Sequence, residues 1–289
     1  MSGLVLSLFP GIGLLDRAFE EEGFCVVRGP DLLWGGDVRR FHPPAGRFDG
    51  VIGGPPCKWW SSAANIAKAR GQKVQPDLIP EFVRCIEESQ PTGLLMENGR
   101  QAPVPIVHGY AIDPHVVNAE WFDADQRRIR RFTFGDVGGR KLPLQSLVLH
   151  RQARHNTVTM RNQKWDKLRQ RPRSNNSTSE WPKALEAQGL PADFLEGAPF
   201  TWRGKWEVVG NGVPLPMGRA VARAVKEALA VKSEAALSAK DDARYERSAE
   251  KQREWWRNMS EEERAEWNRK RVAGMRRYER GRAAKESAA

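Results

Sequence analysis

The sequence predicts an α/β protein whose core is a doubly wound, mostly parallel sheet. Short apolar runs alternate with helix-like segments through residues 1–135, and glycine-rich turns follow two of these runs. Parallel strands joined by crossover helices produce this alternation, and ligands of such folds bind at the edge where the strands end. The apolar runs that we interpret as strands are residues 4–6, 25–27, 51–52, 94–96 and 132–134.

The segment between the first two predicted strands has the pattern of an amphipathic crossover helix. Its apolar residues recur at helical spacing on one side. On the other side, Asp16, Arg17 and residues 20–22 are expected to face solvent. Gly23 is a suitable stop, because glycine adopts the left-handed conformation that ends many helices. A further helix is predicted over residues 217–231.

Length and composition restrict the class of protein. A chain of 289 residues with 40% hydrophobic residues can bury a sizeable core. It has no run of about 20 uncharged apolar residues, as a membrane span requires, and its first residues lack a basic leader. The three cysteines have neither CxxC spacing nor a neighbouring histidine cluster, which argues against disulfides and a metal site. We expect a cytoplasmic monomer without metal or membrane contact.

The positive charge is concentrated in one part of the chain. The net charge is +11, yet residues 1–138 hold 15 basic and 17 acidic residues, whereas residues 139–205 hold 13 basic and 5 acidic ones. A basic block in an otherwise balanced protein suggests a surface that binds a polyanion such as nucleic acid. The alternative is a basic surface that is merely solvated.

These patterns divide the chain into four parts. The central part is basic and lacks sustained periodicity, so we expect loops and short strands there, whereas the last part is charged and helix-prone. The predicted parts are a catalytic domain at 1–138, a small basic region at 139–178, a return to the catalytic domain at 179–232 and a charged helical tail at 233–289.

The first candidate site is the turn Phe-Pro-Gly-Ile-Gly at residues 9–13, which follows the first predicted strand. Glycines at a strand-to-helix turn let the backbone approach a ligand closely at the helix N-terminus. Asp31 lies about 20 residues further on, where nucleotide-binding α/β folds place an acid for ribose hydroxyls. Asp37 is a second acceptor that could meet an adenine amino group. The alternative is that both acids are ordinary loop caps.

The most specific short motif is Gly-Gly-Pro-Pro-Cys at residues 53–57, where the third predicted strand ends. Small and rigid residues form a tight loop there, which would present the thiol of Cys57 at the same edge as the glycine turn. A thiolate nucleophile needs an exposed, electropositive position, and such a loop is not a packing environment. By contrast, we interpret Cys25, within a strand, and Cys85, on an apolar helix face, as inert buried residues.

Two further sets of polar residues border apolar runs. Glu97 follows the fourth run, and partial burial would raise its pKa, so that its protonated carboxyl could donate to a ring nitrogen. Its alternative role is to cap the next element. Gln126, Arg128 and Arg130 alternate just before the fifth run, so their side chains should share one face if the segment is extended. The alternative there is a charged edge strand.

Taken together and in order, these motifs resemble the cytosine-5 DNA methyltransferase family. The resemblance covers roughly residues 4–230, and six motifs in the family's order make chance agreement implausible. The matching motifs are Phe-x-Gly-x-Gly at 9–13, Pro-Pro-Cys at 55–57, Glu-Asn at 97–98, Gln-x-Arg-x-Arg at 126–130, Gln-Gly-Leu-Pro-Ala-Asp-Phe at 188–194 and Val-Gly-Asn-Gly-Val-Pro-Leu-Pro at 209–216.

The resemblance implies a Rossmann-like S-adenosylmethionine methyltransferase fold, acting on carbon 5 of a cytosine swung out of double-stranded DNA. By resemblance, Cys57 attacks ring carbon 6 and Glu97 donates a proton to ring nitrogen 3. Arg128 and Arg130 would hold the base and the catalytic groups. S-adenosylmethionine is the implied cofactor. The residues that match its site are Phe9, Gly11, Ile12, Gly13, Asp37, Pro56, Asn211 and Val213, with Asp31 as the ribose acid.

The sequence departs from the family pattern at a few positions and leaves two other functions open. Lys58 replaces the usual Gln, Gly99 and Gly212 replace the commoner Val and Ser, and the ribose acid normally ends the second strand directly. Residues 139–178 fall where the family keeps its target-recognition region. An RNA cytosine-5 methyltransferase is one alternative, although the Cys-Phe-Thr tripeptide of the tRNA branch is absent. A catalytically silent nucleic-acid-binding protein is the other.

Overall fold

The computed structural model describes most of the first 230 residues. The chain divides into two units, residues 1–232 and 233–289, and the elements discussed below all belong to the first. Most of the predicted tail lies outside the described residues. The described residues are 3–61, 69–72, 74–145, 155, 157–159, 163–166, 171–174, 177–230, 260 and 262.

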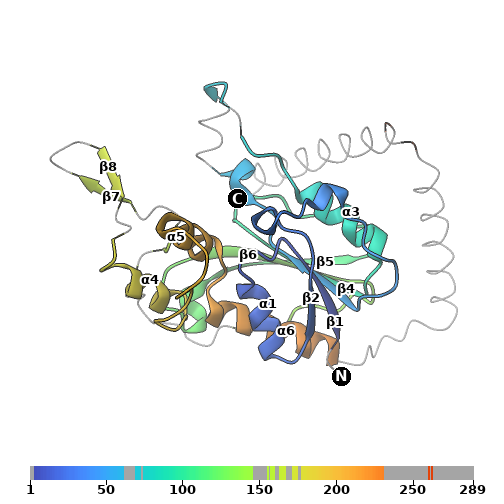
Figure 1. Cartoon of the computed structure of the whole chain (residues 1–289). Coiled ribbons are helices and arrows are strands. Elements are labelled where there is room, and N and C mark those ends of the chain that lie inside the picture. The colour runs from blue at the N-terminus through green and yellow to red at the C-terminus, as the bar shows by residue number, and fades with distance from the viewer. Residues whose placement is uncertain are drawn as a thin grey trace, which may run out of the picture. The chain divides into compact units, whose positions relative to one another are not determined.

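A six-stranded sheet with the order β2-β1-β3-β4-β6-β5 forms the centre of this unit (Figure 1). The first four strands in that order are parallel, and β6 is antiparallel to both of its neighbours. The predicted doubly wound, mostly parallel sheet is thus confirmed. The strands are β1 (Leu4–Leu8), β2 (Cys25–Arg28), β3 (Gly50–Gly53), β4 (Gly93–Asn98), β5 (Ala111–Asn118) and β6 (Ile129–Asp136).

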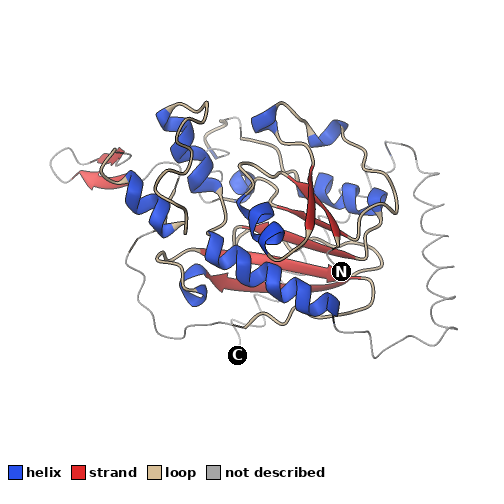
Figure 2. Cartoon of the chain, turned by 60° about the horizontal axis from the view of Figure 1, so that its bottom comes forward, coloured by secondary structure: helices blue, strands red, loops and turns tan. Residues whose placement is uncertain are grey.

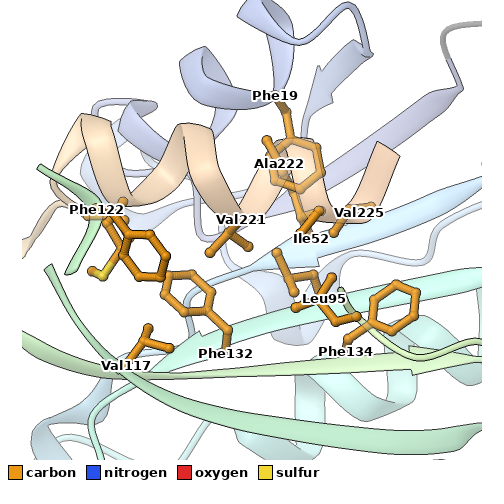
Figure 3. Packing of buried hydrophobic residues seen from close by; sticks show 14 of the residues in the cluster. Phe19, Ile52, Leu95, Val117, Phe122, Phe132, Phe134, Val221, Ala222 and Val225 are labelled. Carbon is orange, nitrogen blue, oxygen red and sulfur yellow. The ribbon is translucent and has the colours of Figure 1, made fainter. Parts of the chain in front are cut away.

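Helices cover both faces of the sheet (Figures 1 and 2). On one face, α1 (Leu14–Glu21) and α6 (Leu215–Ala230) pack side by side. Figure 3 shows Phe19 of α1 and Val221 of α6 above Ile52, Leu95 and the aromatic rings of β6. On the other face, α3 (Ile79–Ser89) packs against the alternate side chains of the same strands. Each central strand is therefore apolar on both faces, which explains its short continuous apolar run.

A smaller set of elements packs beside the main sheet around a third apolar cluster, in which Trp206 and Leu185 are fully buried. Two further short strands pair antiparallel within the predicted basic region. The remaining elements are β7 (Gln163–Asp166), β8 (Arg171–Ser174), α4 (Trp181–Ala187), α5 (Trp202–Asn211) and the 3₁₀ turns η1 (Leu32–Trp34), η2 (Val38–Arg40), η3 (Cys57–Trp60) and η4 (Ala119–Phe122). Among the described residues, no helix is both long and apolar enough to cross a membrane.

Two predictions about burial are wrong. Asp16 does not face solvent but is 1% exposed, because its carboxylate accepts hydrogen bonds from Ser7 Oγ at 2.5 Å and Arg28 Nε at 3.0 Å. Burial raises the pKa of Asp16, and these two donors oppose that rise. Cys25 is exposed rather than buried, because β2 lies at the edge of the sheet. Cys85 is buried as expected.

Candidate active site

The carboxyl ends of β1, β3 and β4 lie at one edge of the sheet, because these strands are parallel neighbours. The glycine turn follows β1, the loop that carries Cys57 follows β3, and Glu97 is the penultimate residue of β4. The fold therefore gathers the three motifs at the edge where doubly wound sheets bind their ligands.

The glycine turn has an unusual backbone. Phe9, Gly11 and Gly13 all have positive φ, at 57°, 57° and 76°. This conformation is costly for a bulky residue such as Phe9 and needs support from its surroundings. A Cβ added at Gly11 would meet no atom within 4 Å, so the space beside this residue is open. The turn thus presents bare backbone at the start of α1.

Asp31 lies against this turn. Its carboxylate accepts hydrogen bonds from the Gly11 N–H at 2.8 Å and from the Leu33 N–H at 2.7 Å. The Trp34 indole Nε1 donates to the Gly11 carbonyl at 2.7 Å and so closes the loop over the turn. Asp31 thus caps η1 and also contacts the glycine turn. Its position therefore agrees both with a loop cap and with an acid beside a ligand at this turn.

The hydrogen bonds and the ion pair that the Asp37 side chain makes within the described residues all involve Arg39, two positions along the chain. Asp37 caps η2 through the Arg39 N–H and forms an ion pair with the Arg39 guanidinium at 2.6 Å. Hydrogen bonds from Arg39 lower the pKa of Asp37 to about 2. In this structure, therefore, Asp37 behaves as the predicted loop cap.

The segment after α5 approaches the turn from the opposite end of the sequence. A Cβ added at Gly212 would lie 2.4 Å from Leu14 Cδ1, so this segment packs directly on the first residue of α1. Val213 is buried in the main core, and Asn211 is exposed. Gly212, which replaces the commoner Ser, is needed for this close packing.

The loop that leads to Cys57 is held at Pro55 by the neighbouring strand. Cys57 is exposed and begins η3. The Asn98 side-chain amide donates to the Pro55 carbonyl at 3.0 Å, and its Oδ1 accepts from the Gly99 N–H at 2.8 Å. Asn98 is 1% exposed, so this buried amide fixes the Cys57 loop relative to the end of β4. The sequence identified Asn98 only as part of a motif.

Glu97 lies between the Cys57 loop and β6. Its Oε1 is 2.9 Å from Arg130 Nε, and its side chain is 13% exposed. A Cβ added at Gly54 would lie 3.1 Å from Glu97 Oε2, so this glycine makes room for the carboxyl group. Burial raises the pKa of Glu97, although the positive charges of Arg130 and Arg128 oppose the rise.

Arg128 is buried deeper than Arg130 and binds backbone. Its guanidinium donates to the Val158 carbonyl at 2.6 Å and to the Gly210 carbonyl at 2.8 Å. Burial and the charge of Arg130 lower the pKa of Arg128 to about 9, while the charges of Glu97 and Cys57 oppose this. The guanidinium thus stays cationic at neutral pH near both acidic groups. The alternative of a charged edge strand is wrong, because β6 lies between β4 and β5.

Two buried glutamines join this region to its surroundings. Gln126 and Gln188 are both 0% exposed, and Gln126 Nε2 donates to Gln188 Oε1 at 3.0 Å. Both residues belong to motifs seen in the sequence, but their contact joins positions 62 residues apart and gives no local signal. Among the described residues, no cluster of three potential metal ligands occurs.

Part of the chain is similar to known proteins. Residues 36–103, which include Cys57 and Glu97, match the family model for C-5 cytosine-specific DNA methylase. The type II methyltransferase M.NgoPII of Neisseria gonorrhoeae is 33% identical over 115 residues, which are 32% of this chain and 32% of that protein. In this region the chain is thus similar to cytosine-5 DNA methyltransferases.

The type II methyltransferase M.HgiDI of Herpetosiphon aurantiacus is also similar to this chain. It is 25% identical over 187 residues, which are 54% of this chain and 59% of that protein. The matched regions thus span about a third to three-fifths of the length of these two curated relatives.

Solved structures share the fold over a larger part of the chain. The Entamoeba histolytica methyltransferase EhMeth superposes with a TM-score of 0.54 at 11% identity, over 79% of this chain and 99% of that one. DNMT2 of Spodoptera frugiperda gives a TM-score of 0.53 at 11% identity, over 79% and 100% of the two chains. At such low identity these structures establish only the fold of this chain, which is the Rossmann-like methyltransferase fold.

Proposed function

We propose that this protein is a DNA (cytosine-5-)-methyltransferase that forms a covalent adduct between Cys57 and the target base. The observation that carries the proposal is the placement of an exposed cysteine, a buried glutamate and a guanidinium at the sheet edge that also holds the glycine turn. The match of the family model to residues 36–103 supports it, because that region contains both the proposed nucleophile and the proposed acid.

S-adenosylmethionine is the cofactor that the family implies, and the residues at the glycine turn fit such a group. The open space at Gly11 and the apolar side chains of Phe9 and Ile12 suit a nucleoside beside bare backbone. Bound S-adenosylmethionine would supply an electrophilic methyl group. We assign it to Phe9, Gly11, Ile12, Gly13, Asp31, Pro56, Asn211 and Val213; Asp37 joins this set only if its carboxylate leaves Arg39.

The chain's own side chains would perform the addition and elimination steps. The Cys57 sulfur, as a thiolate, bonds to ring carbon 6, and the electron pair of the C5–C6 double bond moves into the ring. Glu97 places a proton on ring nitrogen 3, which makes carbon 5 nucleophilic. After the methyl group is added, the carbon 5 proton passes to solvent water, the Cys57 sulfur leaves as a thiolate and the proton on ring nitrogen 3 returns to Glu97, which restores the ring.

The environment of Glu97 suits this role as proton donor. Its raised pKa favours the carboxylic acid, which can donate a hydrogen bond and then a proton. Arg130, at 2.9 Å, stabilises the carboxylate that remains after the transfer. Arg128 adds a second positive charge near Glu97 and Cys57. The arrangement therefore supports both the donation of the proton and its return.

Double-stranded DNA is the proposed substrate, and the target cytosine must leave the helix to reach the recessed carboxyl of Glu97. The basic block at residues 139–205 would bind phosphates. Covalent capture tests the function directly. Duplex DNA carrying 5-fluorocytosine should form a complex that resists denaturation, because fluorine cannot leave as the proton does.

A methyl-transfer assay separates the proposed function from its two alternatives. Purified protein should transfer labelled methyl groups from S-adenosylmethionine to duplex DNA, and bisulfite sequencing should locate them at cytosine. Labelling of transfer RNA but not DNA would instead indicate the RNA methyltransferase. DNA binding without any labelling would indicate the catalytically silent protein.

A further inference from the structure

Gln126 and Gln188 meet in the interior, and the proposed reaction uses neither of them. Both side chains are 0% exposed. Buried amides of this kind are costly unless their hydrogen bonds are made, so their partners indicate what they hold in place.

Backbone partners fix the orientation of both amides. The Val158 N–H donates to Gln126 Oε1 at 3.1 Å, so this atom must be the oxygen. Gln126 Nε2 then donates to the Ala187 carbonyl at 2.7 Å and to Gln188 Oε1 at 3.0 Å. Gln188 Nε2 donates to the carbonyls of Val209 and Gly212. All four amide hydrogens are thus used.

One side of this network holds a segment of the predicted recognition region. The Val158 N–H donates a hydrogen bond to Gln126, and the Val158 carbonyl accepts one from Arg128. Val158 is 3% exposed. The His155 N–H donates to the Asp125 carbonyl at 2.9 Å. Residues 155 and 158 are therefore anchored to the catalytic unit, a few positions before β7 in the sequence.

The other side holds the segment that follows α5. Besides the two carbonyls bound by the Gln188 amide, the Gln188 carbonyl accepts from the Leu215 N–H at 2.9 Å. Gln188 thus fixes the chain on both sides of Asn211 and Val213, which belong to the proposed cofactor site. Gly212 in this segment rests on Leu14 beside the glycine turn.

We propose that Gln126 and Gln188 are positioning residues with separate targets. Gln126 holds the recognition region through Val158 and thereby affects DNA binding, whereas Gln188 holds residues 209–212 and thereby affects cofactor binding. Their mutual hydrogen bond joins the two sites. The inference rests on the proposed function, since it assumes that DNA and S-adenosylmethionine are the ligands.

Near-isosteric, uncharged substitutions test this division. We would measure S-adenosylhomocysteine binding by calorimetry, binding of a labelled mixed-sequence duplex by anisotropy, and the melting temperature of each variant. Gln188→Met should weaken S-adenosylhomocysteine binding about 10-fold and leave DNA binding within about 3-fold of the wild type. Gln126→Met should weaken DNA binding about 10-fold and leave S-adenosylhomocysteine binding within about 3-fold. The reason is that an unpaired buried polar group costs roughly a factor of 10 in binding. The matched control is Gln90→Met, at an exposed position that ends α3 at the opposite edge of the sheet.

Glutamate variants give a second, independent comparison. Gln126→Glu keeps an acceptor for the Val158 N–H but loses the donor to Ala187 and Gln188. Because only the Val158 contact reaches the recognition region, DNA binding should stay within about 3-fold of the wild type, whereas the melting temperature should fall. Gln188→Glu loses the donor to Val209 and Gly212, so S-adenosylhomocysteine binding should stay about 10-fold weak. If the methionine variants do not fold, this pair alone gives the same contrast.

Two outcomes would count against different claims. If each variant weakens both ligands equally, in proportion to its loss of melting temperature, the glutamines only stabilise the fold and the inference is overturned. If the wild-type protein does not bind S-adenosylhomocysteine at all, the proposed function itself fails, whatever the variants do.

Discussion

Arg130 Nε and Glu97 Oε1 are 2.9 Å apart, and this ion pair joins β6 to the end of β4 inside the proposed active site. The pair holds a carboxyl group whose pKa burial raises. The proposed proton donor therefore lies in an environment that disfavours its charge. That balance should be visible both in catalysis and in stability.

For catalysis, Glu97→Gln should lower the single-turnover methylation rate by about 10²- to 10⁴-fold, because the amide cannot transfer a proton to the ring. Binding of duplex DNA should be retained. Glu227→Gln, at an exposed position on α6, is the matched control and should keep the wild-type rate. A Glu97→Gln enzyme with more than about a tenth of the wild-type rate would remove Glu97 from the role of acid.

For stability, the unfolding free energy of the Glu97→Gln variant should increase relative to that of the wild type as the pH rises. The pKa of Glu97 is raised above 4.5 in the folded protein, so the wild type has its full stability below about pH 4.5 and loses some as the pH rises through the folded value. The amide of the Glu97→Gln variant has no proton to lose. The difference between the unfolding free energies of the two proteins, measured by denaturant titration, should shift by at most about 1.4 kcal/mol per pH unit. A difference that is constant from about pH 4 to about pH 8 would contradict the raised pKa.

Cys57→Ser should abolish methylation, by roughly 10⁴-fold or more, because a hydroxyl is a far weaker nucleophile than a thiolate. Since Cys57 is exposed, the fold and S-adenosylhomocysteine binding should be unchanged. Cys25→Ser is a matched control, because Cys25 is also exposed but begins β2 at the opposite edge of the sheet. Adduct formation with 5-fluorocytosine DNA should disappear only in the Cys57 variant.

Gly54→Ala tests whether the loop leaves room for the acid. The added methyl group would lie 3.1 Å from Glu97 Oε2, so the carboxyl must shift, and a small displacement of a catalytic group can cost about 10²-fold in rate. Gly99→Ala is the control, because its methyl group would lie 3.6 Å from Cys57 Cβ, an ordinary contact. We expect the single-turnover rate to fall about 10-fold or more for Gly54→Ala and to change little for Gly99→Ala. Equal losses would show that the space at Gly54 is not specific to Glu97.

The apolar runs predicted β1, β3 and β4, because those strands are buried on both faces, and they also predicted β2, although its residues are mostly exposed at the sheet edge. β5 was missed, since Asp113, Pro114 and His115 interrupt its apolar pattern. This segment is a strand because its backbone pairs with β6 along its whole length. Asp16 and Cys25 were misjudged for a related reason. Whether a strand lies at an edge, and whether a carboxylate finds donors from other elements, depends on the topology rather than on the local pattern.

The motifs likewise predicted that the candidate residues lie at the ends of neighbouring strands, but not which of these residues contact one another. Glu97 and Arg130 belong to segments more than 30 residues apart, and only the antiparallel pairing of β4 and β6 brings them together. The role of Asn98 as a clamp on Pro55 also depends on the neighbouring strand. Asp31 and Asp37 look alike in sequence, yet only Asp31 contacts the glycine turn among their resolved hydrogen bonds.

The contacts of residues 155 and 158 with the catalytic unit change how the predicted recognition region should be exchanged. Val158 packs in the core and binds both Gln126 and Arg128, so replacing all of residues 139–178 would also remove contacts of the catalytic unit. An exchange of residues 160–178 with those of another family member keeps these contacts. This exchange should change which cytosine is methylated, as read by bisulfite sequencing, without lowering the melting temperature.

Deletion of residues 233–289 provides the contrast, because they form a separate unit with 15 basic and 12 acidic residues. If this unit contributes only phosphate contacts, its removal should weaken DNA binding about equally on all sequences and reduce the salt dependence, since fewer counterions are released. The rate on saturating DNA and the methylated motif should stay the same. The measurement that decides is the motif methylated by the truncated enzyme, because a changed motif would show that the tail reads bases and that the recognition region extends beyond residue 178.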